Sequence, residues 1–332
     1  MKLITKWIIS VILVYGGLLW LVKFLGRKMK KGKVTILCYH RILDDKQIKD
    51  YYRPAVAVSV STFKKQMYLL QKKYNVISLD DAVNLLQKRK PLESNYIVVT
   101  FDDGYADNYE NAFPVLKEYN LPAAVFLTTD YIDSSRLLWS DTVGMLLEKK
   151  WDVFLQTELF QAVKNVVNFD DKVTMIDEII STLKTMDEDT RNAIIACLKK
   201  DIGCSVKLNA LMLTWKQIKE MMSKGISFGA HTQSHRFLTS LMLAEKEAEI
   251  KESKDIIEQN LNEQVLYLAY PDGRFDEECK DIAQKSGFQG ACSTIIGDNA
   301  PGCDLFTLKR RDIREDACMN PFGKSSNLFF LI

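Results

Sequence analysis

Short apolar runs alternate along the chain with stretches in which apolar residues recur at helical spacing. Each run is brief and nearly continuously apolar, which is typical of strands covered on both faces. Strands separated by helical stretches predict an α/β fold with a parallel sheet flanked by helices. The runs are Val34 to Cys38, Ile97 to Phe101, Ala123 to Leu127, Ile226 to Ala230, Leu266 to Tyr270 and Phe288 to Ser293.

Two helices carry recognisable start signals. Apolar residues from Phe63 to Tyr74 recur at helical spacing, with Ser59 or Ser61 available as the N-cap. A second, short helix opens at Ser78. Between about 131 and 213 helical stretches follow one another with no strand between them, which predicts a helical insertion in one loop of the fold.

The front of the chain is far more apolar than the rest. Trp7 to Val22 contains no charged residue, and Phe24 and Leu25 extend the run past one lysine. Such a stretch is long enough to cross a bilayer core, so we expect one N-terminal transmembrane helix. The alternative is a cleaved signal peptide, although the first alanine is Ala55 and no A-x-A site precedes it. The expected organisation is an anchor and basic linker over 1–33 and one folded domain over 34–332.

Charge and cysteine usage bear on partners and location. The formal net charge is only +2, so nothing predicts nucleic-acid binding. The apolar run is followed by more basic residues than precede it, a bias that favours a cytoplasmic body. The seven cysteines are scattered without a CxxC pair, as in reduced chains, and those in apolar runs, such as Cys38, read as small buried hydrophobes.

The residues that carry chemistry follow strands. Asp102 and Asp103 emerge directly after Ile97 to Phe101, although Asp-Asp-Gly is also a common turn sequence. His231 and His235 follow another strand, at a spacing that would place both on one side of a helical turn. With Asp103 as third ligand they make the set of two histidines and one carboxylate found at catalytic metal sites. His40, the remaining histidine, also follows a strand.

These motifs resemble those of polysaccharide deacetylases of carbohydrate esterase family 4. Thr-Phe-Asp-Asp-Gly at 100–104 and His-Thr-x-x-His at 231–235 are similar to the family's first two motifs, and the likeness runs from about residue 35 to 324. The pattern is most similar to poly-N-acetylglucosamine deacetylase-like members, whose acid histidine lies at the first strand. The resemblance implies a distorted (β/α) barrel of about seven strands with a helical insertion.

The resemblance also implies roles. Asp103, His231 and His235 would hold a divalent ion, with zinc expected and cobalt, nickel or manganese as alternatives. Asp102 would be the general base, and a backbone N–H near Tyr105 would help to stabilise the oxyanion.

Two departures from the family pattern affect the site. No histidine follows His235, so His40 is the candidate acid that protonates the leaving amine. The third motif lacks the arginine that steadies the base. Arg310, from the last strand, is the candidate replacement, with a surface basic cluster as the competing interpretation. Asp272 stands where relatives often carry tyrosine or asparagine.

The expected function is a membrane-anchored, metal-dependent deacetylase acting on an N-acetylated amino sugar, in a polysaccharide or its lipid-linked precursor. One alternative is a deformylase acting on a polyprenyl-phosphate-linked amino sugar, and another is an inactive carbohydrate-binding barrel. We expect a single-pass protein of the cell membrane. The family resemblance favours a catalytic domain outside the cytoplasm, whereas the charge bias favours the inside.

Overall fold

A closed ring of seven parallel strands forms the centre of the protein. The computed structural model describes residues 32–157, 160–161, 171–202 and 211–315. The ring closes because β1 pairs with both β5 and β10, which confirms the expected barrel. Its strands, in ring order, are β1 (Val34–Tyr39), β5 (Tyr96–Phe101), β6 (Ala123–Leu127), β7 (Ile226–Ala230), β8 (Tyr267–Ala269), β9 (Gly290–Ile296) and β10 (Leu308–Asp312).

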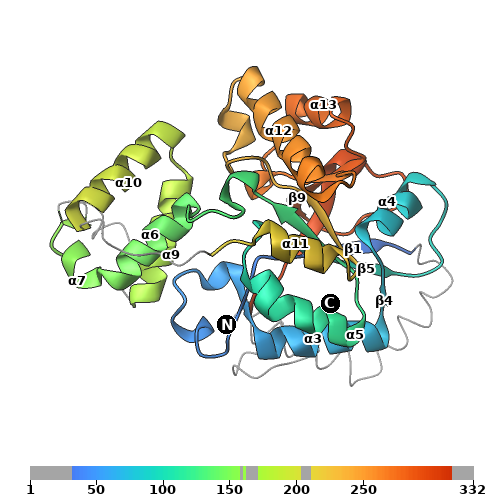
Figure 1. Cartoon of the computed structure of the whole chain (residues 1–332), viewed down its shortest axis with the longest axis horizontal. Helices are drawn as coiled ribbons and strands as arrows, with labels where there is room; N and C mark the ends of the chain where they lie inside the picture. Colours follow the sequence, from blue (N-terminus) through green and yellow to red (C-terminus); the bar gives the residue numbers. More distant parts are fainter. Residues whose placement is uncertain (1–31, 158–159, 162–170, 203–210, 316–332) are drawn as a thin grey trace, which may run out of the picture.

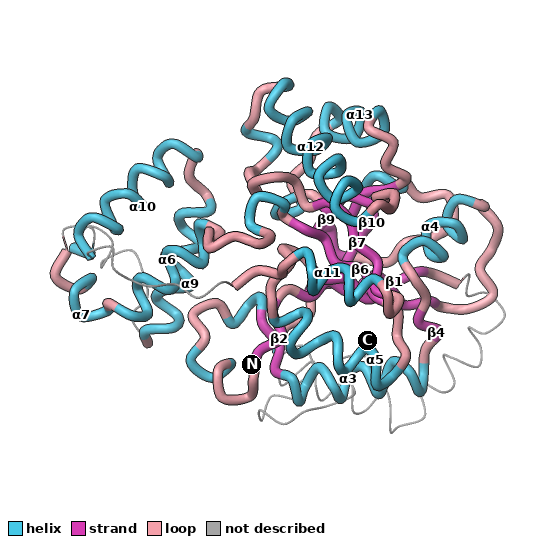
Figure 2. The backbone as a smooth tube through the Cα atoms, viewed as in Figure 1, coloured by secondary structure: helices cyan, strands magenta, loops and turns pink. Residues whose placement is uncertain are grey.

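Burial on both faces explains why these segments are apolar. All six residues of β1 and all five of β6 are buried, because one face fills the barrel and the other meets the helices outside. Because the strands of the ring pair in parallel, their carboxyl ends lie together at one end of the ring. Figure 2 shows these strands gathered at the centre with helices around them. Three short strands lie outside the ring: β4 (Asn75–Val76) extends the β5 edge, while β2 (Arg41–Leu43) and β3 (Ala57–Ser59) pair with each other.

Helices surround the barrel, and two begin at predicted caps. The Ser59 hydroxyl accepts a bond from the Thr62 amide, so Ser59 rather than Ser61 starts α3, and Ser78 starts α4 in the same way. The helices around the barrel are α3 (Val60–Lys73), α4 (Leu79–Gln87), α5 (Phe113–Tyr119), α11 (Trp215–Met222), α12 (Leu243–Leu261) and α13 (Glu277–Lys285). Single turns join them, namely η1 (Ile48–Asp50), η2 (Pro54–Val56), η3 (Asn108–Ala112), η4 (Thr129–Tyr131), η5 (Leu238–Ser240), η6 (Pro271–Gly273) and η7 (Leu305–Thr307).

Most of the connection from β6 to β7 is a group of helices that stands beside the barrel (Figure 1). These helices are α6 (Trp139–Lys149), α7 (Trp151–Phe154), α9 (Lys172–Lys184) and α10 (Glu188–Ile202). They share a hydrophobic core that is separate from the barrel core and that also takes in Tyr51 and Tyr52 from the β2–β3 connection. The helical connection is therefore packed against the barrel through this loop.

The predicted membrane anchor lies outside the described residues. Among residues 32–157, 160–161, 171–202 and 211–315, no helix has both the length and the apolar character needed to cross a bilayer. The boundary between anchor and barrel therefore stays a prediction.

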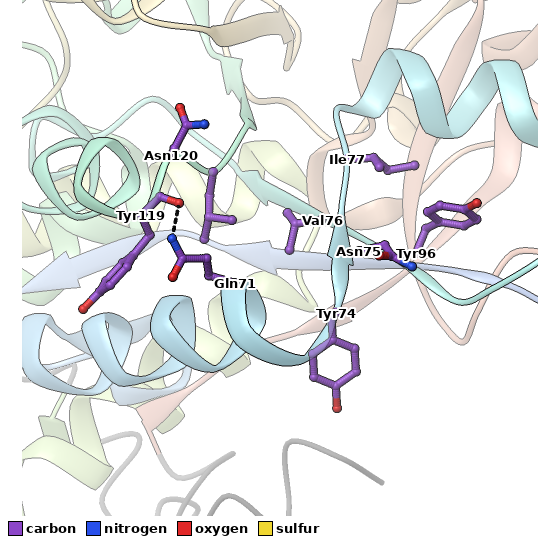
Figure 3. Close-up of a pocket in the computed structure, with 9 residues that line it drawn as sticks. Gln71, Tyr74, Asn75, Val76, Ile77, Tyr96, Tyr119 and Asn120 are labelled. Atoms are coloured by element: carbon purple, nitrogen blue, oxygen red, sulfur yellow. Dashed lines mark hydrogen bonds between the residues drawn. The ribbon is translucent and has the colours of Figure 1, made fainter.

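A hollow of about 620 Å³ lies at the amino ends of β5 and β6 (Figure 3). Its lining comes from the last turns of α3 and α5 and from β4, and includes Gln71, Tyr74, Tyr96 and Asn120. Since the Asp102–Asp103 pair follows the opposite end of β5, this hollow is remote from the candidate site.

Candidate active site

Three side chains converge as a metal site would require. The His235 Nε2 and His231 Nε2 atoms lie 3.2 Å and 3.4 Å from the same oxygen, Oδ1 of Asp103. All three ligand atoms fall within 4.8 Å of one another. Asp103 and His231 are buried, and Asp103 Oδ1 receives no hydrogen bond of good geometry from the described part of the chain. A buried carboxylate oxygen without a donor, facing two imidazole nitrogens, fits a divalent cation.

The orientation of the first histidine is set from β8. His231 Nδ1 lies 2.7 Å from the Ala269 carbonyl oxygen, a contact that places the proton on Nδ1 and leaves Nε2 free as a ligand. Burial by itself would lower the pKa of His231, but Asp102 and Asp103 raise it above its usual value. Proton and metal therefore compete for the same nitrogen.

The expected helical turn at the two histidines is wrong. Residues 231–235 form a non-helical loop in which Thr232 and His235 have φ of 63° and 60°. Glu249 on α12 holds this loop, since one of its carboxylate oxygens accepts bonds from the Gln233 and Ser234 amides, each at 2.9 Å. These two bonds hold the amides in the loop conformation. No sequence signal singles out Glu249, because its helix is mostly polar.

The second aspartate is held by a buried arginine. Arg310 Nη1 and Nη2 donate to the two carboxylate oxygens of Asp102, each at 2.7 Å, and its Nε donates to the Ser293 carbonyl at 2.9 Å. The residue is 1% exposed, so the alternative of a surface basic cluster is wrong for Arg310. The surface ion pair belongs to its neighbour Arg311, which contacts Asp298.

This pairing sets the charge of Asp102. Burial alone would raise the pKa of Asp102, but the Arg310 guanidinium outweighs it and the pKa falls to about 2. The thiol of Cys38 lies 3.5 Å from Asp102 Oδ2. Burial raises the pKa of this thiol, so Cys38 stays neutral and can donate. The apolar run around Cys38 predicted only a small buried residue at this position.

His40 lies beside the same carboxylate. One of its ring nitrogens falls within 4.8 Å of an Asp102 oxygen and of the Cys38 sulfur. The His40 backbone is tied to the barrel, because its carbonyl accepts a bond from Asn108 Nδ2 at 2.8 Å. The structure thus brings His40 and Arg310 together at Asp102, the residue next to the ligand Asp103.

The segment that follows Asp103 has a constrained backbone. Asp103 and Gly104 have φ of 73° and 82°, which explains why glycine follows the two aspartates. Tyr105 then forms an antiparallel bridge with Met212, made by the Ala106 amide and the Gly104 carbonyl. The Tyr105 amide is not one of the donors in this bridge.

Asp272 is joined to the helical connection. Its carboxylate pairs with Arg274 at 2.9 Å and with Lys184 of α9. Its φ is 55°, a conformation that aspartate tolerates better than most residues. Asp272, which departs from the tyrosine or asparagine of many relatives, therefore forms an ion pair that links η6 to α9.

Comparisons with known proteins agree with this architecture. The polysaccharide deacetylase family model matches residues 89–291. A Bacillus subtilis protein named as a polysaccharide deacetylase, YxkH, is 23% identical over 89% of this chain and 76% of its own length. The poly-beta-1,6-N-acetyl-D-glucosamine N-deacetylase of Staphylococcus epidermidis is 30% identical over 40% of this chain and 48% of its own length.

Solved structures share the fold. The Streptococcus pyogenes deacetylase PplD, in complex with acetate, superimposes with a TM-score of 0.58 at 21% identity, covering 87% of this chain and 95% of that one. The family match spans well over half of the chain and includes the Asp102–Asp103 pair and both histidines of the 231–235 loop. The chain therefore belongs to the polysaccharide deacetylase family, hydrolases of carbohydrate esterase family 4 that act on amide bonds.

Proposed function

We propose that this protein is a metal-dependent deacetylase that removes the acetyl group from N-acetylated amino sugars of a glycan. The observation that carries the proposal is the convergence of His231, His235 and Asp103 beside the ion-paired Asp102. The named Staphylococcus epidermidis relative acts on poly-beta-1,6-N-acetyl-D-glucosamine, so a polymer of this type is the first substrate to test. The matched region spans about half of that relative's length, and the substrate is therefore part of the proposal.

The metal-binding residues in this proposal are His231, His235 and Asp103. A divalent ion, zinc or alternatively cobalt, nickel or manganese, supplies Lewis-acid polarisation of the acyl carbonyl and lowers the pKa of water. Asp103 suits this role because the imidazoles nearby outweigh its burial and hold its pKa well below the usual value, so it stays ionised.

The other residues move protons. Asp102 accepts the proton of the attacking water as the water oxygen bonds to the acyl carbon, while Arg310 keeps its carboxylate oriented. The Tyr105 amide donates to the oxyanion that forms. His40 then donates a proton to the departing nitrogen, the carbon–nitrogen bond breaks, and acetate and a free amine are released.

The two alternatives are less well supported. An inactive carbohydrate-binding barrel has no need for the buried Asp102–Arg310 pair or for three converging ligands. No observation favours a formyl over an acetyl group, and a parallel assay with N-formylated substrate separates the two.

The experiment uses the full chain, stripped of metal and reloaded with zinc, cobalt, nickel or manganese in turn. Amine release is measured from a β-1,6-linked N-acetylglucosamine oligomer. Asp102→Asn is expected to abolish turnover while retaining metal, and His231→Ala to lose both. Asp130→Asn, which breaks an exposed ion pair with Arg136, is the matched control and should keep its activity. Full activity in Asp102→Asn would remove Asp102 from the mechanism, and an inactive reloaded protein would favour the binding barrel.

We also propose that residues 1–33 form a membrane anchor and linker for a barrel over 34–332, in a single-pass protein. The support is the uncharged run from Trp7 to Val22. Thiol labelling of an engineered surface cysteine from outside intact cells tests the side on which the barrel lies. Labelling only after lysis would place the barrel inside, where a lipid-linked precursor rather than mature polymer is the accessible substrate.

A further inference from the structure

Asp141, on α6, is a buried carboxylate that the proposed mechanism does not use. Its side chain is fully buried, and both of its oxygens accept hydrogen bonds from tyrosines. Tyr105 donates to Oδ2 at 2.9 Å, and Tyr52 donates to Oδ1 at 3.1 Å. Arg53 Nη1 also lies 4.0 Å from Oδ1, so three side chains from outside α6 meet at this one buried carboxylate.

The two tyrosines come from different places. Tyr105 follows the Asp102–Asp103 pair, and its amide is the proposed oxyanion donor. Tyr52 belongs to the loop between β2 and β3 and packs against Gly144 of α6. We call residues 104–106 the site segment. One oxygen of Asp141 therefore links α6 to the site segment, and the other oxygen links α6 to the loop between β2 and β3.

The position of the Tyr105 side chain is fixed from several directions. The Arg41 guanidinium lies 4.3 Å from the centre of its ring, and Arg41 itself pairs with the buried Asp107. The backbone of Tyr105 is held at the bridge to Met212. The bond from the hydroxyl to Asp141 is the hydrogen bond that ties this side chain to α6.

We propose that Asp141 is a positioning residue: through the Tyr105 hydroxyl, α6 holds the backbone at 104–106 where the Tyr105 amide can meet the developing oxyanion. The inference rests on the proposed deacetylase function. An oxyanion donor is effective only at hydrogen-bond distance from the oxyanion, so a small displacement of this segment weakens the transition state more than substrate binding. The helical connection thus takes part in catalysis without touching substrate.

The two tyrosines provide a matched test. Tyr105→Phe and Tyr52→Phe each remove one hydroxyl from the same carboxylate, but only the first lies on the site segment. In the metal-loaded full chain, Tyr105→Phe should lower kcat by at least about fivefold and leave KM nearly unchanged. Complete loss of an oxyanion donor lowers kcat roughly a hundredfold, and a displaced donor should lose part of that effect. Tyr52→Phe should keep kcat within about twofold, although both variants lose a similar hydrogen bond from the folded state.

The further variants and readouts separate positioning from stability. Asp141→Asn should lower kcat as Tyr105→Phe does. The double variant Tyr105→Phe/Asp141→Asn should show little additional loss of kcat, because both changes act on kcat through the same bond between Tyr105 and Asp141. Zinc affinity should be unchanged in each.

Several outcomes would overturn the inference. Equal kcat for the two Phe variants, or an Asp141→Asn protein that melts earlier but turns over normally, would mean that Asp141 is only structural. If Asp141→Asn does not fold, the two Phe variants alone decide. A wild-type protein without hydrolytic activity in any metal would reject the proposed function, and this inference with it.

Discussion

The ion pair between Arg310 and Asp102 offers a quantitative test of the site. We consider Arg310→Met, which keeps the length of the side chain and removes its charge. The change leaves Asp102 buried and unpaired, and breaking a buried pair in this way costs about 3–5 kcal/mol. Because one pKa unit corresponds to about 1.4 kcal/mol, the pKa of Asp102 should rise by roughly two to four units. That increase starts from about 2 in the intact pair.

The measurements are a melting curve and the pH dependence of kcat/KM. A loss of this size lowers Tm by about 10 °C in a domain of this class. The acid limb of the pH profile should move upward, because the carboxylate is now protonated at higher pH and cannot act as a base. Arg311→Met is the control: its pair with Asp298 is partly exposed, so it should cost less than about 1 kcal/mol.

A second variant tests the reasoning further. In Asp102→Asn/Arg310→Met both charges are gone, so stability should recover relative to Arg310→Met alone while activity stays absent. An Arg310→Met protein that melts like the Arg311→Met control, with an unmoved acid limb, would refute the assignment of this pair.

Three other predictions concern proton transfer, metal binding and packing. His40→Gln should slow amide hydrolysis at least about a hundredfold yet barely affect an aryl acetate ester, whose leaving group departs without a proton; equal losses on both would contradict the acid role. Metal affinity, followed with a chelating dye, should fall as the pH drops through the raised pKa of His231, so the midpoint of this fall should lie above the usual histidine value of about 6.5; a midpoint below 6.5 would contradict the prediction. Gly144→Ala should lower stability by about 1–2 kcal/mol in denaturant unfolding, because its Cβ would overlap the Tyr52 ring; a stabilised variant would show that α6 can shift.

Much of the fold was predictable because the barrel strands have strong local signals. The observed strands β1, β5, β6 and β7 differ in length from the predicted apolar runs by one residue at most. Parallel strands covered on both faces are necessarily apolar, so the pattern is read directly. The shortest strand of the ring, β8, has three residues where five were expected. Strand ends also placed Asp102 and Asp103, because chemistry follows the carboxyl ends of barrel strands.

The loop at the two histidines shows where local reasoning fails. The spacing of His231 and His235 was informative, but the helical turn inferred from it was wrong. The loop conformation depends on Glu249, which lies on α12 and is distant in sequence. Contacts between distant parts of the sequence leave no periodic signal. The same holds for the contact of Cys38 with the Asp102 carboxylate and for the contacts of Asp141 with two tyrosines.

The sequence by itself determined the strand pattern, the helix caps and the residue types of the site. Only the tertiary structure decided which of two adjacent arginines enters the core. The β10 sequence Leu-Lys-Arg-Arg-Asp lacks the apolar alternation that would identify its inner face. Pairing with β1 sets Arg310 opposite Ile36 and buries it, while Arg311 reaches Asp298 nearer the surface. Side chains alternate along a strand, so a register that no local pattern specifies decides which arginine meets Asp102.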